Sequence, residues 1–400
     1  MNILDRFLKY VSISTNSDSE SSKNPSTESQ KEFAKILFEE LKQMHLDEVY
    51  LDEKYCYVYG VLNGNENFKK IGFVSHMDTA EAVTDINVKP QIIRNYNGET
   101  VHLNETEVLD VKKYPDLKNH IGKTLITTDG STLLGADDKA GIAEIMTMLE
   151  DVIKNNTPHG DIFVAFTPDE EIGSGAEFID FSRFKPDFAY TVDGSSLGEI
   201  SFENFNAASI KIEINGVSTH LGDAKNILVN SQLIANKIIN QVPEEFPEGT
   251  EKYEGYYHLD SINGDVQKTR MKFLIRDFDK ENFEKRKNKF IEIVNKLNIE
   301  YNNCIEIKIS DTYYNMKEKI MDNMHIIENA KNAMENVGVT PLIKETRGGT
   351  DGAEITNKGI PCPNLGTGGH NFHSIYEYIC CQDMEKTAQI LTEIIKIYAK

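Results

Sequence analysis

Three short apolar runs in the chain predict strands that are buried on both faces. They are Ile71 to Val74, Ile162 to Phe166 and Phe188 to Val192. Between the first two runs, residues 140–153 carry apolar side chains at helical spacing, which predicts an amphipathic helix. Strands that alternate with helices in this way favour an α/β domain.

The segment before these strands predicts a loop that ends in a helix. Residues 13–29 are rich in Ser, Thr and Asn, and Thr27 and Gln30 have the spacing of a capping box. Apolar side chains then recur at near-helical intervals from Phe33 to Met44, so one face of this helix can pack on a sheet.

From about residue 206 the pattern changes to alternating strands. Strands are expected at 210–214, 253–259, 270–275 and 305–309, with helices at 227–239 and 281–297. The order β-α-β-β-α-β is that of a split βαβ sandwich, which predicts an inserted α+β domain over 206–312. Residues 1–205 and 313–400 then form the first domain, which ends with a helix at 321–336, a strand at 342–345 and a helix at 384–398.

Composition argues against several kinds of partner and favours a cytoplasmic location. A length of 400 residues favours two domains over one. The formal net charge of −21 makes the surface negative, which disfavours binding to nucleic acid and to anionic membranes. Five cysteines without CxxC spacing indicate reduced thiols. No apolar run has membrane-spanning length, and the charged N-terminus does not suit a secretory signal.

Acidic and histidine residues follow each of the three buried strands. His76 and Asp78 follow the first, Glu170 and Glu171 the second, and Asp193 the third. Each one alone is commonly a structural histidine, solvated surface charge or a turn aspartate. Together they lie where open α/β sheets place their ligand-binding residues.

Two glycine-rich turns add further candidates. Gly135-Ala136-Asp137-Asp138 opens the helix at 140–153, and one aspartate there is explained as a helix cap, whereas the second needs another reason. His370 and His373 lie in a late glycine-rich stretch. A single loop histidine can be incidental, whereas two histidines so close together favour a role in binding.

A cluster of these carboxylates requires cations. Like charges about 4 Å apart repel by roughly 4 kcal/mol per pair at an effective dielectric constant near 20. His, Asp and Glu without Cys are typical of catalytic zinc, with cobalt or manganese as alternatives, and a carboxylate has two oxygens that can bridge two ions. Bound water would become acidic, and Glu170 is the candidate base for its proton.

The motifs, in this order and separation, resemble those of the co-catalytic two-zinc exopeptidases over nearly the whole chain. Besides the HMD, GADDKAG, PDEEIGSG, TVDG and HNFHS motifs, the likeness includes NVKPQ, YHL, IRDFD and RGGTDGA, which resemble the tripeptide aminopeptidases of that family. The resemblance implies a mixed-sheet catalytic domain, with the inserted domain as a lid.

The resemblance also implies residue roles. His76, Asp137 and Asp193 would hold one zinc ion, and Asp137, Glu171 and His373 the other, with Asp137 bridging. Asp78 would support His76, Glu170 would be the general base, and the Asp137–Asp138 peptide bond would be cis. His220 would reach the substrate carbonyl or carboxylate from the lid, with a surface-loop histidine as the alternative. Arg276 and Arg347 would anchor the substrate carboxylate, with structural ion pairs as the alternative.

By this resemblance we expect removal of the N-terminal residue from tripeptides. A dipeptidase, an N-acyl amino acid deacylase and a catalytically silent peptide-binding relative are the alternatives. Short peptides are the expected partners, together with a second copy of the chain bound through the lid. Two departures put substrate preference in doubt: Glu81-Ala82 replaces the usual Pro-Asp, and His370 replaces an aromatic residue.

Overall fold

The computed structural model describes residues 1–400 and divides them into two compact units. Unit 1 comprises Met1–Phe202, Glu318–Lys344 and Thr350–Lys400, and unit 2 comprises Glu203–Lys317 and Glu345–Gly349. The segment Glu345–Gly349, which the sequence pattern assigned to the first domain, therefore belongs to unit 2. None of the helices combines the length and the apolar character needed to cross a membrane.

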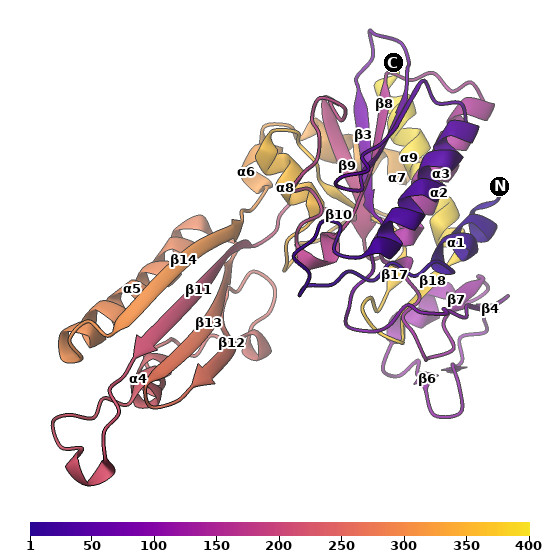
Figure 1. Ribbon diagram of the computed structural model, residues 1–400. Helices are drawn as coiled ribbons and strands as arrows, with labels where there is room; N and C mark the ends of the chain where they lie inside the picture. The colour runs from indigo at the N-terminus through magenta and orange to yellow at the C-terminus, as the bar shows by residue number, and fades with distance from the viewer. The chain divides into compact units, whose positions relative to one another are not determined.

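An eight-stranded mixed sheet forms the centre of unit 1 (Figure 1). Its strands, in spatial order, are β1 (Glu48–Leu51), β2 (Val58–Leu62), β8 (Ile162–Thr167), β3 (Ile71–His76), β9 (Phe188–Gly194), β16 (Asn364–Gly366), β10 (Glu199–Ser201) and β15 (Leu342–Ile343). The three predicted strands are confirmed as β3, β8 and β9. Strand β3 lies between β8 and β9 and is parallel to both, so the carboxyl ends of the three strands share one edge.

Helices pack around this sheet and account for the apolar stripes in the sequence. They are α1 (Ile3–Val11), α2 (Glu28–Gln43), α3 (Ala136–Lys154), α7 (His325–Asn336), α8 (Asp351–Lys358) and α9 (Cys381–Tyr398), with the short α6 (Lys317–Met321) at the boundary of the units. Helix α3 contacts α1, α9 and the strands β3 and β9. It is therefore buried along most of its length rather than on one face alone.

The start of α2 is where the sequence placed it, but the cap differs. Thr27 precedes the helix without capping it, and its hydroxyl donates to the carbonyl of Asn16 instead. Gln30 does not reach back to the backbone of Thr27; its side-chain amide donates to Asp169 Oδ1 at 2.7 Å. The predicted capping box is therefore wrong, because both side chains bind more distant partners.

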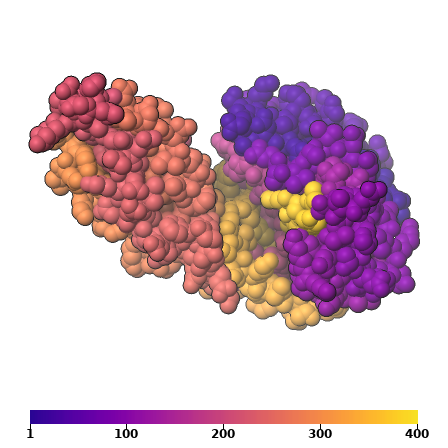
Figure 2. Space-filling view, turned by 90° about the horizontal axis from the view of Figure 1, so that it is seen from below, coloured from indigo at the N-terminus to yellow at the C-terminus, as the bar shows by residue number.

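Smaller sheets complete unit 1. One has the order β17 (Gly369–His370), β18 (Tyr378–Cys380), β7 (Leu125–Thr127) and β4 (Gln91–Ile93), and the other pairs β5 (Val101–His102) with β6 (Val108–Leu109). Two 3-10 helices, η1 (Pro115–His120) and η2 (Glu170–Ile172), lie in the connecting segments. In the view from below, a patch of yellow atoms from the C-terminal part of the chain borders violet atoms from the N-terminal half (Figure 2).

Unit 2 has the predicted β-α-β-β-α-β order. Its elements are β11 (Asn206–Asn215), α4 (Ser231–Ile239), β12 (Tyr256–Gly264), β13 (Lys268–Asp277), α5 (Lys280–Glu300) and β14 (Ile305–Tyr313), with two 3-10 helices, η3 (Leu221–Asp223) and η4 (Pro247–Gly249). The four strands form an antiparallel sheet in the order β12-β13-β11-β14. Helices α4 and α5 pack on it over an apolar core of their own.

Candidate active site

The carboxyl ends of the parallel strands in unit 1 bring the predicted site residues together. His76 is the last residue of β3, Asp193 is the next-to-last residue of β9, and Glu170 and Glu171 begin η2 just after β8. Atoms of His76, Asp137 and Glu171 lie within 4.8 Å of one another, as do those of His76, Glu170 and Asp193. His373 joins them from the loop between β17 and β18.

Asp137 lies between the two histidines. One of its oxygens, Oδ1, is 2.9 Å from Nε2 of His76, and the other, Oδ2, is 3.1 Å from Nε2 of His373. Asp193 Oδ1 is 3.3 Å from His76 Nε2, and Glu171 Oε2 is 3.0 Å from His373 Nε2. The side chains therefore form two groups that share Asp137.

The local backbone explains why Asp137 points into the cluster. Asp137 and Asp138 have non-helical φ/ψ angles within α3, and the bond between them is cis, as expected. Neither aspartate caps the helix, because the N-cap residue is Gly135 without a side-chain hydrogen bond. Asp138 instead turns toward β3, where its carboxylate accepts the Ser75 hydroxyl and the backbone N–H of His76.

Asp78 supports two parts of the site. The Nδ1–H of His76 donates to the backbone carbonyl of Asp78 at 3.0 Å, while the Asp78 carboxylate is farther away at 3.4 Å. This hydrogen bond leaves the lone pair of Nε2 free to bind a cation. The carboxylate oxygens of Asp78 accept the backbone N–H groups of Glu170 and Glu171 at 3.0 and 3.1 Å.

Two supporting acids were not identified from the sequence. Glu377 accepts the backbone N–H groups of Leu134, Gly135 and Asp137 and so holds the turn before α3. Asp169 accepts hydrogen bonds from Ser26 and Gln30, which ties the α2 start to the β8 loop. The only sequence signals were their positions: Glu377 lies four residues after His373, and Asp169 directly precedes Glu170.

The excess of buried carboxylates in the cluster favours the binding of cations. Burial raises the pKa of Glu171 to about 7 and that of Asp193 to about 6, and it raises the pKa of Glu170 well above its ordinary value. Two histidines cannot compensate this many carboxylates. In addition, Oε1 of Glu171 is buried without a hydrogen-bond partner. Divalent ions would supply both the missing charge and a partner for this oxygen.

The exposure of the cluster shows where a substrate can enter. The His76 side chain is 2% exposed and that of Asp137 12% exposed, whereas His373 is 49% exposed. Hydrogen bonds to Asp137 and Glu171 raise the pKa of His373 to about 10. The site is thus closed on the β3 side and open at His373.

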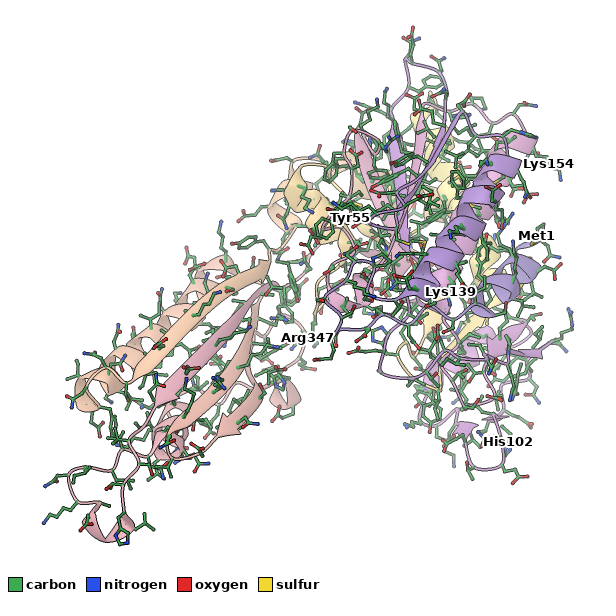
Figure 3. The ribbon with its side chains drawn as sticks, in the orientation of Figure 1. Met1, Tyr55, His102, Lys139, Lys154 and Arg347 are labelled. Atoms are coloured by element: carbon green, nitrogen blue, oxygen red, sulfur yellow. The ribbon has the colours of Figure 1, made fainter.

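His220, Arg276 and Arg347 all belong to unit 2, although the sequence pattern had assigned Arg347 to the first domain. His220 is 84% exposed beside η3, and its Nδ1 accepts the backbone N–H of Gly222. Arg347, labelled in Figure 3, donates to the carbonyls of Lys252 and Glu254 and to the hydroxyl of Thr250.

The contacts of Arg276 and of the two residues that depart from the family pattern, Glu81 and His370, are as follows. The guanidinium of Arg276 donates to the carbonyl of Ile275 and lies over the Tyr313 ring. Glu81 accepts the backbone N–H and the hydroxyl of Ser19 on an exposed loop. The His370 ring stacks on Tyr378, with centroids 4.7 Å apart, so the imidazole packs as an aromatic ring would.

Comparisons with known proteins agree with this geometry. Residues 128–397 match the model of Peptidase family M20/M25/M40. The chain is 52% identical over 404 residues to Peptidase T of Halothermothrix orenii, covering 99% of both chains, and 50% identical over 408 residues to Peptidase T of Alkaliphilus oremlandii, covering 100% of both.

Solved structures show the same fold. The aminopeptidase PepT of Bacillus cereus superposes with a TM-score of 0.80 at 24% identity, and a tripeptidase of Staphylococcus aureus with a TM-score of 0.80 at 25% identity. Each match covers 100% of this chain and 98% of the other. The chain therefore belongs to the M20/M25/M40 peptidase family and, within it, to the peptidase T group.

Proposed function

We propose that the protein is a metal-dependent aminopeptidase that releases the N-terminal residue from tripeptides. The observation that carries the proposal is the placement of Asp137, whose two oxygens each face a different histidine. A shared carboxylate of this kind is typical of two-metal hydrolases. The curated relatives at about half identity are named Peptidase T, which supports the tripeptide as substrate.

The ligands divide between two ions. His76, Asp137 and Asp193 would hold one, and Asp137, Glu171 and His373 the other. Imidazole and carboxylate ligands without a thiolate favour zinc in a catalytic site, and cobalt or manganese can replace it. When bound, such ions polarise a carbonyl group and lower the pKa of coordinated water.

Glu170 is the proton carrier in this proposal. Its backbone N–H is held by Asp78, and its side chain lies within the group formed with His76 and Asp193. Burial and the charge of Asp193 raise the pKa of Glu170, which favours a carboxyl group that can hold a proton between two steps. It would accept a proton from the attacking water and later donate it to the leaving amine.

Unit 2 would act as the lid over the substrate. The exposed imidazole of His220 would donate to the substrate carbonyl or carboxylate, and Arg276 and Arg347 would bind the substrate carboxylate. Three hydrogen bonds already engage the Arg347 guanidinium, so Arg276 is the freer of the two. A homodimer through the lid and a cytoplasmic location complete the proposal, the latter supported by five free cysteines.

A substrate panel tests the proposed specificity. Purified protein loaded with zinc would be assayed on free di-, tri- and tetrapeptides of one sequence and on N-acetyl amino acids. We expect the highest kcat/KM for the tripeptide and release of its N-terminal residue. A preference for dipeptides or acetylated compounds would refute the tripeptidase proposal, and no turnover of any compound would favour a peptide-binding relative.

A further inference from the structure

A second group of metal-ligand side chains lies in unit 1 apart from the active site. It consists of His120 at the end of η1, Cys380 at the end of β18 and Asp383 in the first turn of α9. The three residues are 5%, 0% and 2% exposed. One ligand atom from each lies within 4.8 Å of the others. Cys380 and Asp383 are neighbours where β18 passes into α9, whereas His120 comes from a segment more than 250 residues earlier in the chain.

Three polar atoms of this group have no hydrogen-bond partner. Both ring nitrogens of His120 and Oδ2 of Asp383 are buried and unpartnered. Nδ1 of His120 lies 3.1 Å from Oδ2 of Asp383, which is close enough for a hydrogen bond but not aligned for one. A buried polar atom without a partner is costly, so the arrangement calls for a further binding partner.

Side chains that bind the same metal ion approach one another in this way, close together but not aligned for a hydrogen bond. Bonds of about 2.0–2.3 Å in a tetrahedral site place neighbouring ligand atoms roughly 3.3–3.8 Å apart, each directed at the ion rather than at its neighbour. The imidazole and the carboxylate of the group already lie near that separation. A histidine, a cysteine and an aspartate are all ligands that zinc accepts.

We propose that His120, Cys380 and Asp383 bind a divalent ion of the zinc class, separate from the catalytic ions. Lys123 Nζ donates to Oδ1 of Asp383 at 2.6 Å, which fixes the carboxylate and leaves Oδ2 for the ion. The Cys380 thiol gives up its proton to solvent when it binds. Since burial raises the pKa of that thiol, the ion itself must supply the charge that stabilises the thiolate.

The ion would have a structural role, because it would cross-link separate segments of unit 1. It would join the end of η1 to the junction of β18 and α9, where Lys123 and Thr124 already bond to Asp383 and Gln382. The His120 ring also packs edge-on against His370, with centroids 5.0 Å apart. His370 lies three residues before His373. The bound ion would therefore restrict the motion of the segment that carries this active-site histidine.

Cobalt substitution distinguishes this site from the catalytic one. A thiolate bound to Co²⁺ gives a charge-transfer band in the near ultraviolet, and the catalytic ligands include no cysteine. Chelator-treated protein titrated with CoCl₂ should develop this band in the wild type and lose it in Cys380→Ser. Cys381→Ser is the matched control and should keep the band, because that neighbouring buried thiol contacts Glu385 instead.

Zinc content gives a second readout that does not depend on the thiol variant. After dialysis against equal free zinc, His120→Phe should hold about one ion fewer per chain than the wild type and should retain the two catalytic ions. No band in cobalt-loaded wild type, a band that survives Cys380→Ser, or a wild-type content of only two ions would overturn the proposal.

Discussion

Replacing Asp78 with asparagine tests how the active site is held in place. The carboxylate of Asp78 is completely buried and accepts the backbone N–H groups of both Glu170 and Glu171. Asparagine has the same shape but only one acceptor oxygen. In the variant, one of the two N–H groups must therefore face the NH₂ group of the new side chain.

The cost follows from this lost acceptor. One buried donor without a partner costs about 1–3 kcal/mol, and the remaining hydrogen bond weakens by roughly 1 kcal/mol because it loses its charge, which gives about 2–4 kcal/mol in total. If the loop moves to relieve this cost, the ligand Glu171 moves with it. Zinc affinity should then fall by about 10- to 100-fold.

Two assays measure the two outcomes together. Urea unfolding of chelator-treated protein gives the free energy of unfolding, and competition with a chromogenic chelator gives zinc affinity. Asp52→Asn is the contrasting control: one oxygen of Asp52, Oδ1, accepts the backbone N–H groups of both Lys54 and Tyr55, so asparagine can keep both hydrogen bonds and little stability should be lost. Wild-type stability and wild-type zinc affinity in Asp78→Asn would together refute the supporting role of Asp78.

Four further predictions follow from the site and the core. Glu170→Gln should lower kcat by about 10²–10⁴-fold with unchanged metal content, and unchanged turnover would remove Glu170 from the mechanism. His220→Ala should lower turnover without loss of metal, whereas normal kinetics would leave it a surface-loop residue. Chelation should lower both activity and Tm, and zinc should restore them, because the clustered carboxylates repel one another without cations; an unchanged Tm would contradict this. Arg6→Ala should destabilise the protein by about 1.5–3 kcal/mol in urea unfolding, because Glu40 loses its buried partner and keeps only Lys9, and a loss below about 1 kcal/mol would contradict this.

Much of the fold was predictable because its signals are local. Runs of apolar residues identified β3, β8 and β9, and the alternating pattern identified the order of elements in unit 2. The carboxyl ends of parallel neighbouring strands necessarily meet, so His76 and Asp193 could be placed near one another before the structure was known.

The supporting contacts could not be predicted, since they join segments that are distant in the sequence. Gln30 has the spacing of a helix cap but binds Asp169, and Glu377 holds a turn more than two hundred residues earlier. The group of His120, Cys380 and Asp383 likewise forms only when η1 folds against β18 and α9. Cys380 and Asp383 lie three residues apart at the start of α9, but no spacing rule links them to His120 in η1.

Metal analysis of Asp137→Ala tests the central claim most directly. If Asp137 bridges two ions, the variant should lose two bound ions per chain relative to the wild type after dialysis at equal free zinc, and peptidase activity with them. His373→Ala, which removes a ligand of one ion, should lose only one. Retention of one tightly bound active-site ion in Asp137→Ala would contradict a shared ligand and the two-metal site built on it.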